Sequence, residues 1–172
     1  MQGLYEINNG LNVYDYLITS KDLACCLESS STNQNAKEKL LVHEDAEDLN
    51  LSLYLDQEII NHIEQHDPLT CLDHTNVNEF CLAMEGISHF VYRSWNAIHD
   101  RAVTLMEMEL QAEVDKFIMM MRYLDQQANQ LEPGRLRRLL FSSPRLREDL
   151  DYEQSRRYWD ASLYTEKYCR TL

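Results

Sequence analysis

Several ionisable residues lie inside the most apolar third of the chain, and their types and spacing could do chemistry. Glu85 precedes His89 by four residues, and Glu109 and Glu113 follow in the next predicted helix. Residues four apart share a helix face, so two such helices side by side would bring three carboxylates and an imidazole together. Such a set can bind a metal ion, transfer protons, or form a hydrogen-bonded cluster with a structural role.

An arginine near the end of the chain extends this candidate site. Arg157 falls within the apolar face predicted for the last helix, where a buried guanidinium needs a carboxylate partner such as Glu113. The predicted polar cluster is therefore Glu85, His89, Glu109, Glu113 and Arg157.

The spacing of the acids favours a structural role for this cluster. Helical dimetal sites repeat a Glu and a His three residues apart, whereas this chain has one such pair, four apart. We therefore expect no metal and no cofactor. The alternative is a metal site or a small-ligand site formed by Glu85, His89, Glu109 and Glu113.

A second pair of histidines also has metal-ligand spacing. His62 and His66 are one turn apart in a short predicted helix, but the acid between them is misplaced for the metalloprotease pattern. Imidazoles in the last turn of a helix are favoured by the helix dipole without a metal. We keep His62 and His66 as a weaker alternative metal site.

Other catalytic patterns are missing from the sequence. There is no Gly-x-Ser-x-Gly turn, and four glycines are too few for a phosphate-binding loop. Cys81 lies on an apolar helix face with no cationic neighbour in sequence, so its thiol is expected to be inert. Whether the protein is an enzyme stays open at this point.

Charge is distributed unevenly along the chain. Residues 1–80 carry 15 acids and 3 bases, whereas residues 81–172 carry 14 acids and 13 bases. A net charge of −13 repels nucleic acids and anionic membranes, so we expect neither as a partner and favour a basic protein. Without a leader-like or membrane-spanning apolar run, we expect a cytoplasmic protein whose five cysteines are reduced and mostly buried.

One basic patch stands out against this acidity. Its five arginines lie within 13 residues that contain no acid: Arg135, Arg137, Arg138, Arg145 and Arg147. Leucines alternate with them, which is typical of an amphipathic segment that docks on a surface. We expect these arginines to meet the acidic half of this protein or of a second copy, rather than an external polyanion.

The clearest strand is Leu49 to Leu55, where four leucines alternate with other residues in the period of a half-buried strand. Leu40 to His43 is a second apolar run, and the acidic residues between the two runs favour a turn. We therefore predict an antiparallel hairpin that packs all four leucines against helices and turns the intervening residues outward.

Helical patterns account for most of the remaining chain. Their predicted ranges are 15–27, 57–66, 76–97, 104–132 and 143–172. Asp56 and Thr104 have the positions of helix caps, Pro133 ends the fourth helix, and Ser143-Pro144 starts the last. The stripe predicted to face the core in the last helix is Leu150, Tyr158, Ala161, Tyr164, Tyr168 and Leu172.

The fold class that follows is mostly α (α+β): a helical domain of about five helices with one small antiparallel hairpin near residues 40–55. We predict a single domain over 1–172, with an N-terminal helical piece at 1–28, a polar loop at 29–35, and the hairpin and helical core at 36–172. Ile118 and Met119 lie off the apolar stripe of their helix, so self-association into a homo-oligomer is a further expectation.

Composition and motifs together favour a function in protein-protein contact. We expect a small acidic adaptor, inhibitor or immunity-type binder of a basic partner. The alternative is a helical metal- or ligand-binding protein, or an enzyme, that uses the predicted polar cluster.

Overall fold

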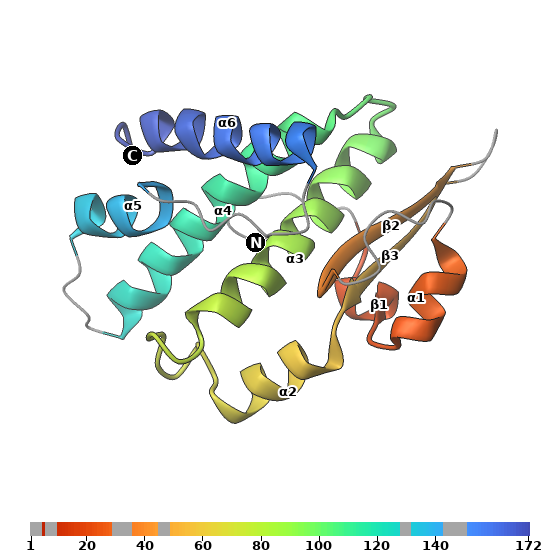
Figure 1. The fold of residues 1–172 in the computed structure, drawn as a ribbon, viewed down its shortest axis with the longest axis horizontal. Coiled ribbons are helices and arrows are strands. Elements are labelled where there is room, and N and C mark those ends of the chain that lie inside the picture. The colour runs from red at the N-terminus through yellow and green to blue at the C-terminus, as the bar shows by residue number, and fades with distance from the viewer. Residues whose placement is uncertain (1–4, 6–9, 29–35, 45–48, 128–131, 143–150) are drawn as a thin grey trace.

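A small mixed sheet and two long helices form the centre of the fold in the computed structural model (Figure 1). The structure describes residues 5, 10–28, 36–44, 49–127, 132–142 and 151–172. The polar loop predicted at 29–35 lies outside these residues. Mostly helical structure with a small sheet, as predicted, is confirmed.

The predicted hairpin is present. Strands β2 (Glu38–Glu44) and β3 (Leu49–Leu55) pair antiparallel, with Leu40 opposite Leu53. A third strand, β1 (Leu17–Ile18), pairs parallel with the other edge of β3, giving the order β1-β3-β2. The sequence did not reveal β1, because two residues are too short for a periodic pattern.

Burial along β3 departs from the predicted alternation. Leu53 and Leu55 are buried, but Leu49 and Leu51 are only half-buried, and Tyr54 on the opposite face is buried as well. Tyr54 packs with Ala24 and Leu41 beneath α1 (Lys21–Leu27), whereas Leu53 and Leu55 pack with Ala83 of α3. Because helices cover both faces of the sheet, the prediction that the intervening residues all point outward was wrong at Tyr54.

Six α-helices and one 3₁₀-helix occur within the described residues. After the 3₁₀-helix at Val13–Tyr16 and α1, they are α2 (Gln57–Gln65), α3 (Val77–Ile98), α4 (Leu105–Gln126), α5 (Pro133–Phe141) and α6 (Tyr152–Tyr168). None of the described helices has an apolar stretch long enough to cross a lipid bilayer.

Local sequence signals explain most helix ends. Asp56 accepts the backbone N–H of Glu58 at the start of α2, and Thr104 forms a capping box with Glu107 at the start of α4. The predicted end of the fourth helix at Pro133 was wrong, because α4 ends at Gln126 and Pro133 instead occupies the first turn of a separate helix, α5. The start predicted for the last helix at Ser143-Pro144 lies outside the described residues, and α6 begins after the cap Asp151.

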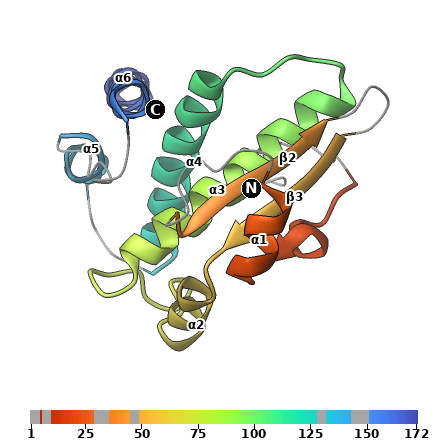
Figure 2. The ribbon, with the colours of Figure 1, turned by 45° about the vertical axis from the view of Figure 1, so that its right-hand side comes forward.

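The elements are arranged in layers around α3. Figure 2 shows α1 on one side of the sheet and α3 on the other, with α4 behind α3. Helix α6 packs on the far side of α4, and α5 contacts both α4 and α6. Helix α3 is therefore covered by the sheet on one side and by α4 on the other, so polar residues near its middle are enclosed.

An apolar core joins one end of α3 and α4 to the C-terminal helices. It contains Leu72, Phe80, Met84, Phe117, Met119, Met120, Leu124, Leu136, Phe141 and Cys169. Met119 is buried in this core, and Ile118 packs against it. These two residues therefore offer no free face for self-association, and the reason given for a homo-oligomer was wrong.

The face that α6 buries matches the predicted stripe only in part, since Ala161 is buried and Tyr158 is half-buried as expected. Ala161, Ser162, Thr165 and Cys169 are its buried residues, whereas Tyr164, Tyr168 and Leu172 of the predicted stripe are exposed. Small side chains on the inner face allow α6 to lie close to α4. Most of the large side chains of α6 are left facing solvent.

The cysteines are all free thiols, in agreement with the sequence. Cys25, Cys26 and Cys71 are exposed, so the expectation that most are buried was wrong. Cys25 and Cys26 lie on the outer side of the short helix α1, which has a single buried residue, Ala24.

Candidate functional site

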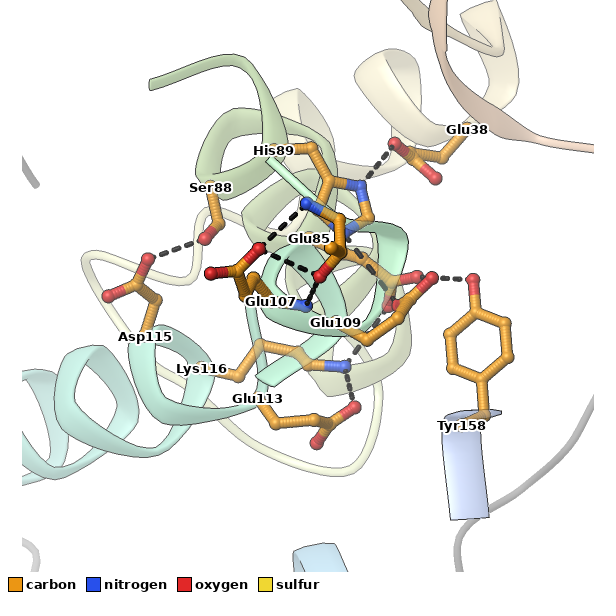
Figure 3. Close-up of polar contacts among 11 residues, drawn as sticks. Glu38, Glu85, Ser88, His89, Glu107, Glu109, Glu113, Asp115, Lys116 and Tyr158 are labelled. Atoms are coloured by element: carbon orange, nitrogen blue, oxygen red, sulfur yellow. Dashed lines mark hydrogen bonds and ion pairs between the residues drawn. The ribbon is translucent and has the colours of Figure 1, made fainter. Parts of the chain in front are cut away.

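Four elements bring seven ionisable side chains together beside α3 (Figure 3). The buried polar cluster consists of Glu38 from β2, Glu85 and His89 from α3, Glu109, Glu113 and Lys116 from α4, and Tyr158 from α6. Glu85 and His89 share one face of α3 and Glu109, Glu113 and Lys116 one face of α4, as the helical period requires. The packing of α3 on α4 joins the two faces.

His89 lies between two carboxylates. Its Nδ1 atom is 3.7 Å from Glu38 and its Nε2 atom is 3.7 Å from Glu109. Burial would lower the pKa of His89, but Glu38, Glu109 and Glu85 together raise it to about 9. These separations are ion-pair distances, too long for direct hydrogen bonds, and Nε2 has no hydrogen-bond partner among the described residues.

Lys116 holds two of the acids. Its Nζ atom donates to Glu113 at 2.6 Å and to Glu85 at 3.0 Å. Burial would lower the pKa of the Lys116 ammonium, but the two carboxylates raise it well above its ordinary value, so it is charged. Burial likewise opposes ionisation of Glu85, yet Lys116 and His89 keep its pKa below the ordinary value.

The last helix contributes a hydroxyl. The phenol hydroxyl of Tyr158 donates a hydrogen bond to Glu85 at 3.2 Å. Burial, and to a lesser extent the nearby carboxylates, raises the pKa of Tyr158, so the phenol is neutral. Glu85 thus accepts from Lys116 through one oxygen and from Tyr158 through the other. A carboxylate has about four acceptor sites, so Glu85 keeps lone pairs for a further partner.

In Glu109 the cost of burying a negative charge is not offset by its cationic neighbours. Burial raises its pKa to about 7, and Glu85 and Glu38 add to this effect, while His89 and Lys116 oppose it. An acid in the first turn favours the start of a helix. In α4, Glu107 has that role through Thr104, whereas Glu109 is buried within the cluster.

Three members have the arrangement of metal ligands. One donor atom each from Glu85, His89 and Glu109 lies within 4.8 Å of the other two. Glu113, the fourth ligand considered from the sequence, is instead 2.6 Å from Lys116. The structure therefore brings three of the four alternative ligands together and assigns the fourth to an ion pair.

Arg157 does not join the cluster. Its Nε atom is buried without a hydrogen-bond partner among the described residues, and Glu113, the partner predicted for it, is bound to Lys116. The next residue, Tyr158, reaches Glu85 instead. A shift of one position on a helix turns a side chain by about 100°, which exceeds what a predicted stripe can resolve.

A second buried acid lies one turn from the cluster. Asp115 is 1% exposed and accepts hydrogen bonds from Ser88 on α3, from Gln111 at 3.0 Å and from the phenol of Tyr5. Burial and the bond to Asp115 raise the pKa of Tyr5, which therefore remains a neutral donor. Both carboxylate oxygens have donors, so we assign Asp115 a structural role.

The histidine pair on α2 is arranged differently from a metal site. His62 and His66 stack with ring centroids 4.8 Å apart, and the Nε2 atom of His62 lies 2.8 Å from the carbonyl oxygen of Thr75. Glu79 is 3.8 Å from the same nitrogen. His62 therefore ties α2 to the start of α3, which is a structural task.

The basic patch falls mainly on α5. Arg135 and Arg138 are exposed, while Arg137 bonds Glu166 of α6 at 3.2 Å. Arg145 and Arg147 lie outside the described residues. The partner of Arg137 belongs to the C-terminal half, not to the acidic N-terminal half that we expected.

Three residues of the buried polar cluster were not predicted from the sequence: Glu38, Lys116 and Tyr158. Lys116 follows Glu113 by three residues, a spacing at which side chains meet on one helix face, and this signal was available. Glu38 and Tyr158 come from distant elements and have no local signal.

Comparisons with family models, curated proteins and solved structures found no match for this chain.

Proposed function

We propose that the protein acts by binding a basic protein through the outer face of α6. The observation that carries this proposal is the orientation of that helix. Its buried residues are small, while its large apolar residues Tyr152, Trp159 and Leu163 point to solvent along one side of the helix. We call these three residues the α6 outer face.

The composition of the α6 outer face is that of a binding surface. Each of its side chains is at least 46% exposed, and Trp159 is 52% exposed. Burying such groups is favourable, so a helix that exposes them and buries alanine and serine loses stability unless another surface covers them. Tryptophan and tyrosine also dominate the binding energy of protein interfaces.

Charge favours a basic partner over a second copy. Residues 151–172 carry four acids and four bases. Arg156 pairs with Asp160 on α6, and Arg170, just after the helix, pairs with Glu166. The α6 outer face is therefore close to neutral, and the net charge of −13 sets the long-range field. That field repels another copy of the chain and attracts a protein of opposite sign.

Site-specific crosslinking tests the proposal. A photoreactive benzoylphenylalanine replaces Trp159 in one variant and, as a matched control, Tyr14, which is 77% exposed on the 3₁₀-helix before β1. Each variant is irradiated in extract from the source cells, and crosslinked proteins are identified by mass spectrometry. We expect one protein of positive net charge to crosslink from position 159 and not from position 14.

The captured protein is then purified and its affinity measured. Trp159→Ala is expected to weaken binding by at least about thirtyfold, the effect of losing an interface hot spot. Tyr14→Ala is expected to leave the affinity unchanged. If the chain instead crosslinks to itself, and sedimentation shows dimers, the partner of the α6 outer face is a second copy and not a basic protein. Equal capture from both positions would reject the α6 outer face.

A further inference from the structure

Glu85, His89 and Glu109 turn one donor atom each toward a common point between α3 and α4. We propose that these three residues bind one divalent first-row transition metal ion, of the class of zinc or manganese. This site is independent of the α6 outer face.

The separations of the donors suit a single ion. Nitrogen and oxygen ligands lie about 2.1 Å from zinc, so two ligands at a tetrahedral angle stand about 3.4 Å apart. His89 Nε2 and Glu109 are 3.7 Å apart, and the whole set lies within 4.8 Å. A small inward movement of flexible glutamate side chains brings the donors to bonding distance.

The imidazole is held in the orientation that a metal ligand needs. Metal binding would displace the proton from Nε2 of His89, and Glu38, 3.7 Å from Nδ1, favours keeping the other proton on Nδ1, so that Nε2 faces the ion. Nε2 is buried and has no hydrogen-bond partner among the described residues, although it points toward Glu109. A buried nitrogen without a partner is costly, and a metal ion would satisfy it.

Outer contacts also position Glu85. Lys116 and Tyr158 each donate to one of its oxygens, at 3.0 and 3.2 Å. Lys116 is in turn bound to Glu113 at 2.6 Å. Hydrogen bonds of this kind orient carboxylate ligands in metalloproteins, and they leave lone pairs on Glu85 for the ion.

The net charge of the cluster also favours the binding of a cation. Four carboxylates face one lysine and one histidine in a buried space. A divalent cation would offset the excess of negative charge where water cannot. One imidazole with two carboxylates favours zinc, manganese or ferrous iron, whereas magnesium prefers all-oxygen sites.

Direct titration of the full-length, chelator-treated protein tests the site. Isothermal titration with zinc, manganese and magnesium chlorides is expected to give one site per chain with a Kd below about 10 μM for zinc or manganese, and no such site for magnesium. The bound ion is expected to raise Tm. The result that would overturn the proposal is no binding of either transition metal tighter than about 1 mM.

The ligand variants are chosen so that unfolding cannot imitate loss of metal. Glu109→Gln keeps the shape and removes a costly buried charge, so the metal-free variant should be at least as stable as the wild type while binding metal at least tenfold more weakly. His66→Ala, at the C-terminal cap of α2, is the control and should bind as the wild type does. Unchanged affinity in Glu109→Gln, or loss of binding in His66→Ala, would place the ion elsewhere.

A spectroscopic signature identifies the nitrogen ligand. Electron spin echo measurements on the manganese-loaded protein are expected to show coupling to one imidazole nitrogen. The coupling should be absent from His89→Gln, whose folding is checked by circular dichroism. If His89→Gln does not fold, the wild type and the His66→Ala control provide the test, and both should show the coupling. Absence of the coupling from both proteins would exclude His89 as a ligand.

Discussion

Gly86 on α3 lies directly against Leu53 on β3, at the contact that joins the helical part of the protein to its sheet. A Cβ atom on Gly86 would stand 2.7 Å from Leu53 Cδ1 and 2.9 Å from Glu38 Cγ. Real Cβ atoms do not approach other atoms so closely, so the side chain missing from Gly86 is what allows α3 and the sheet to meet. The same close approach places Glu38 beside His89.

Gly86→Ala is therefore expected to destabilise the protein although alanine favours helices. Overpacking costs about 1–3 kcal/mol, and the gain in helix propensity offsets about 1 kcal/mol, so the net loss should be up to about 2 kcal/mol. Urea denaturation measures it. Gly134→Ala on α5 is the control, since its nearest neighbour is 3.8 Å away, and it should be neutral or stabilising. A stable Gly86→Ala protein would mean that β3 can shift.

Replacing Lys116 by Met should cost about 3–5 kcal/mol of unfolding free energy, because Glu85 and Glu113 would lose their buried cation. Adding Glu85→Gln to this variant should recover part of the loss, because one unpaired charge disappears. Denaturation of the single and double variants provides the measurement. If the double variant is no better than the single one, the Lys116–Glu85 pair is not the source of the loss.

A surface ion pair of equal length supplies the control for Lys116. Lys37 and Glu58 are also 3.0 Å apart, but their side chains are 53% and 77% exposed. Water screens such pairs, so Lys37→Met should change stability by less than about 0.5 kcal/mol. A loss comparable to that of Lys116→Met would contradict the dominant role given to burial.

The buried polar cluster should make the metal-free protein less stable as pH rises. The pKa of His89 is raised from 6.5 to about 9, so its contribution is complete below about pH 6.5 and is lost as pH rises through about 9. Burial raises the pKa of Glu109 from 4.5 to about 7, which acts in the same direction between those values. Glu85, with a lowered pKa, acts oppositely in acid.

Urea denaturation at pH 6, 7.5 and 9 with a chelator present measures this dependence. Stability is expected to fall over the series, and Glu109→Gln should flatten the part between pH 6 and 7.5. A rise in stability from pH 6 to 9 would show that other groups outweigh the cluster.

Thiol reactivity should divide the cysteines into two sets. Cys25, Cys26 and Cys71 are exposed and should react within seconds to minutes with a thiol reagent. Burial raises the pKa of Cys81 and of Cys169 to about 11, so both should react slowly in the folded protein. Denaturation should release all five, and a lower total would reveal a disulfide.

Features encoded by neighbouring residues were predictable from the sequence. The leucine alternation predicted β3, and Asp56 and Thr104 marked the starts of α2 and α4, because each signal acts within a few residues. The helix predicted at 76–97 also begins where α3 does, next to Asn76. The side chain of Asn76 does not cap α3, and its amide instead donates to the carbonyls of His66 and Cys71.

Features that depend on which surfaces meet were not predictable. The orientation of α6 follows from close packing of its small residues on α4, whereas its pattern of tyrosines predicted a face that also included Tyr164 and Tyr168, which are exposed. The candidate site shows the same division. Glu85 and His89 were found from their spacing, but Glu38 and Tyr158 join them only through tertiary packing.

The central place of β3 has a consequence for handling this protein. Its sequence LNLSLYL has strong strand propensity and no net charge, which is the composition of segments that pair between molecules when an edge is uncovered. Two residues of β1, Leu17 and Ile18, cover that edge. A protease cut or an N-terminal truncation that removes β1 would therefore leave the chain prone to aggregation, and any shortened form of the protein should keep residues 10–28.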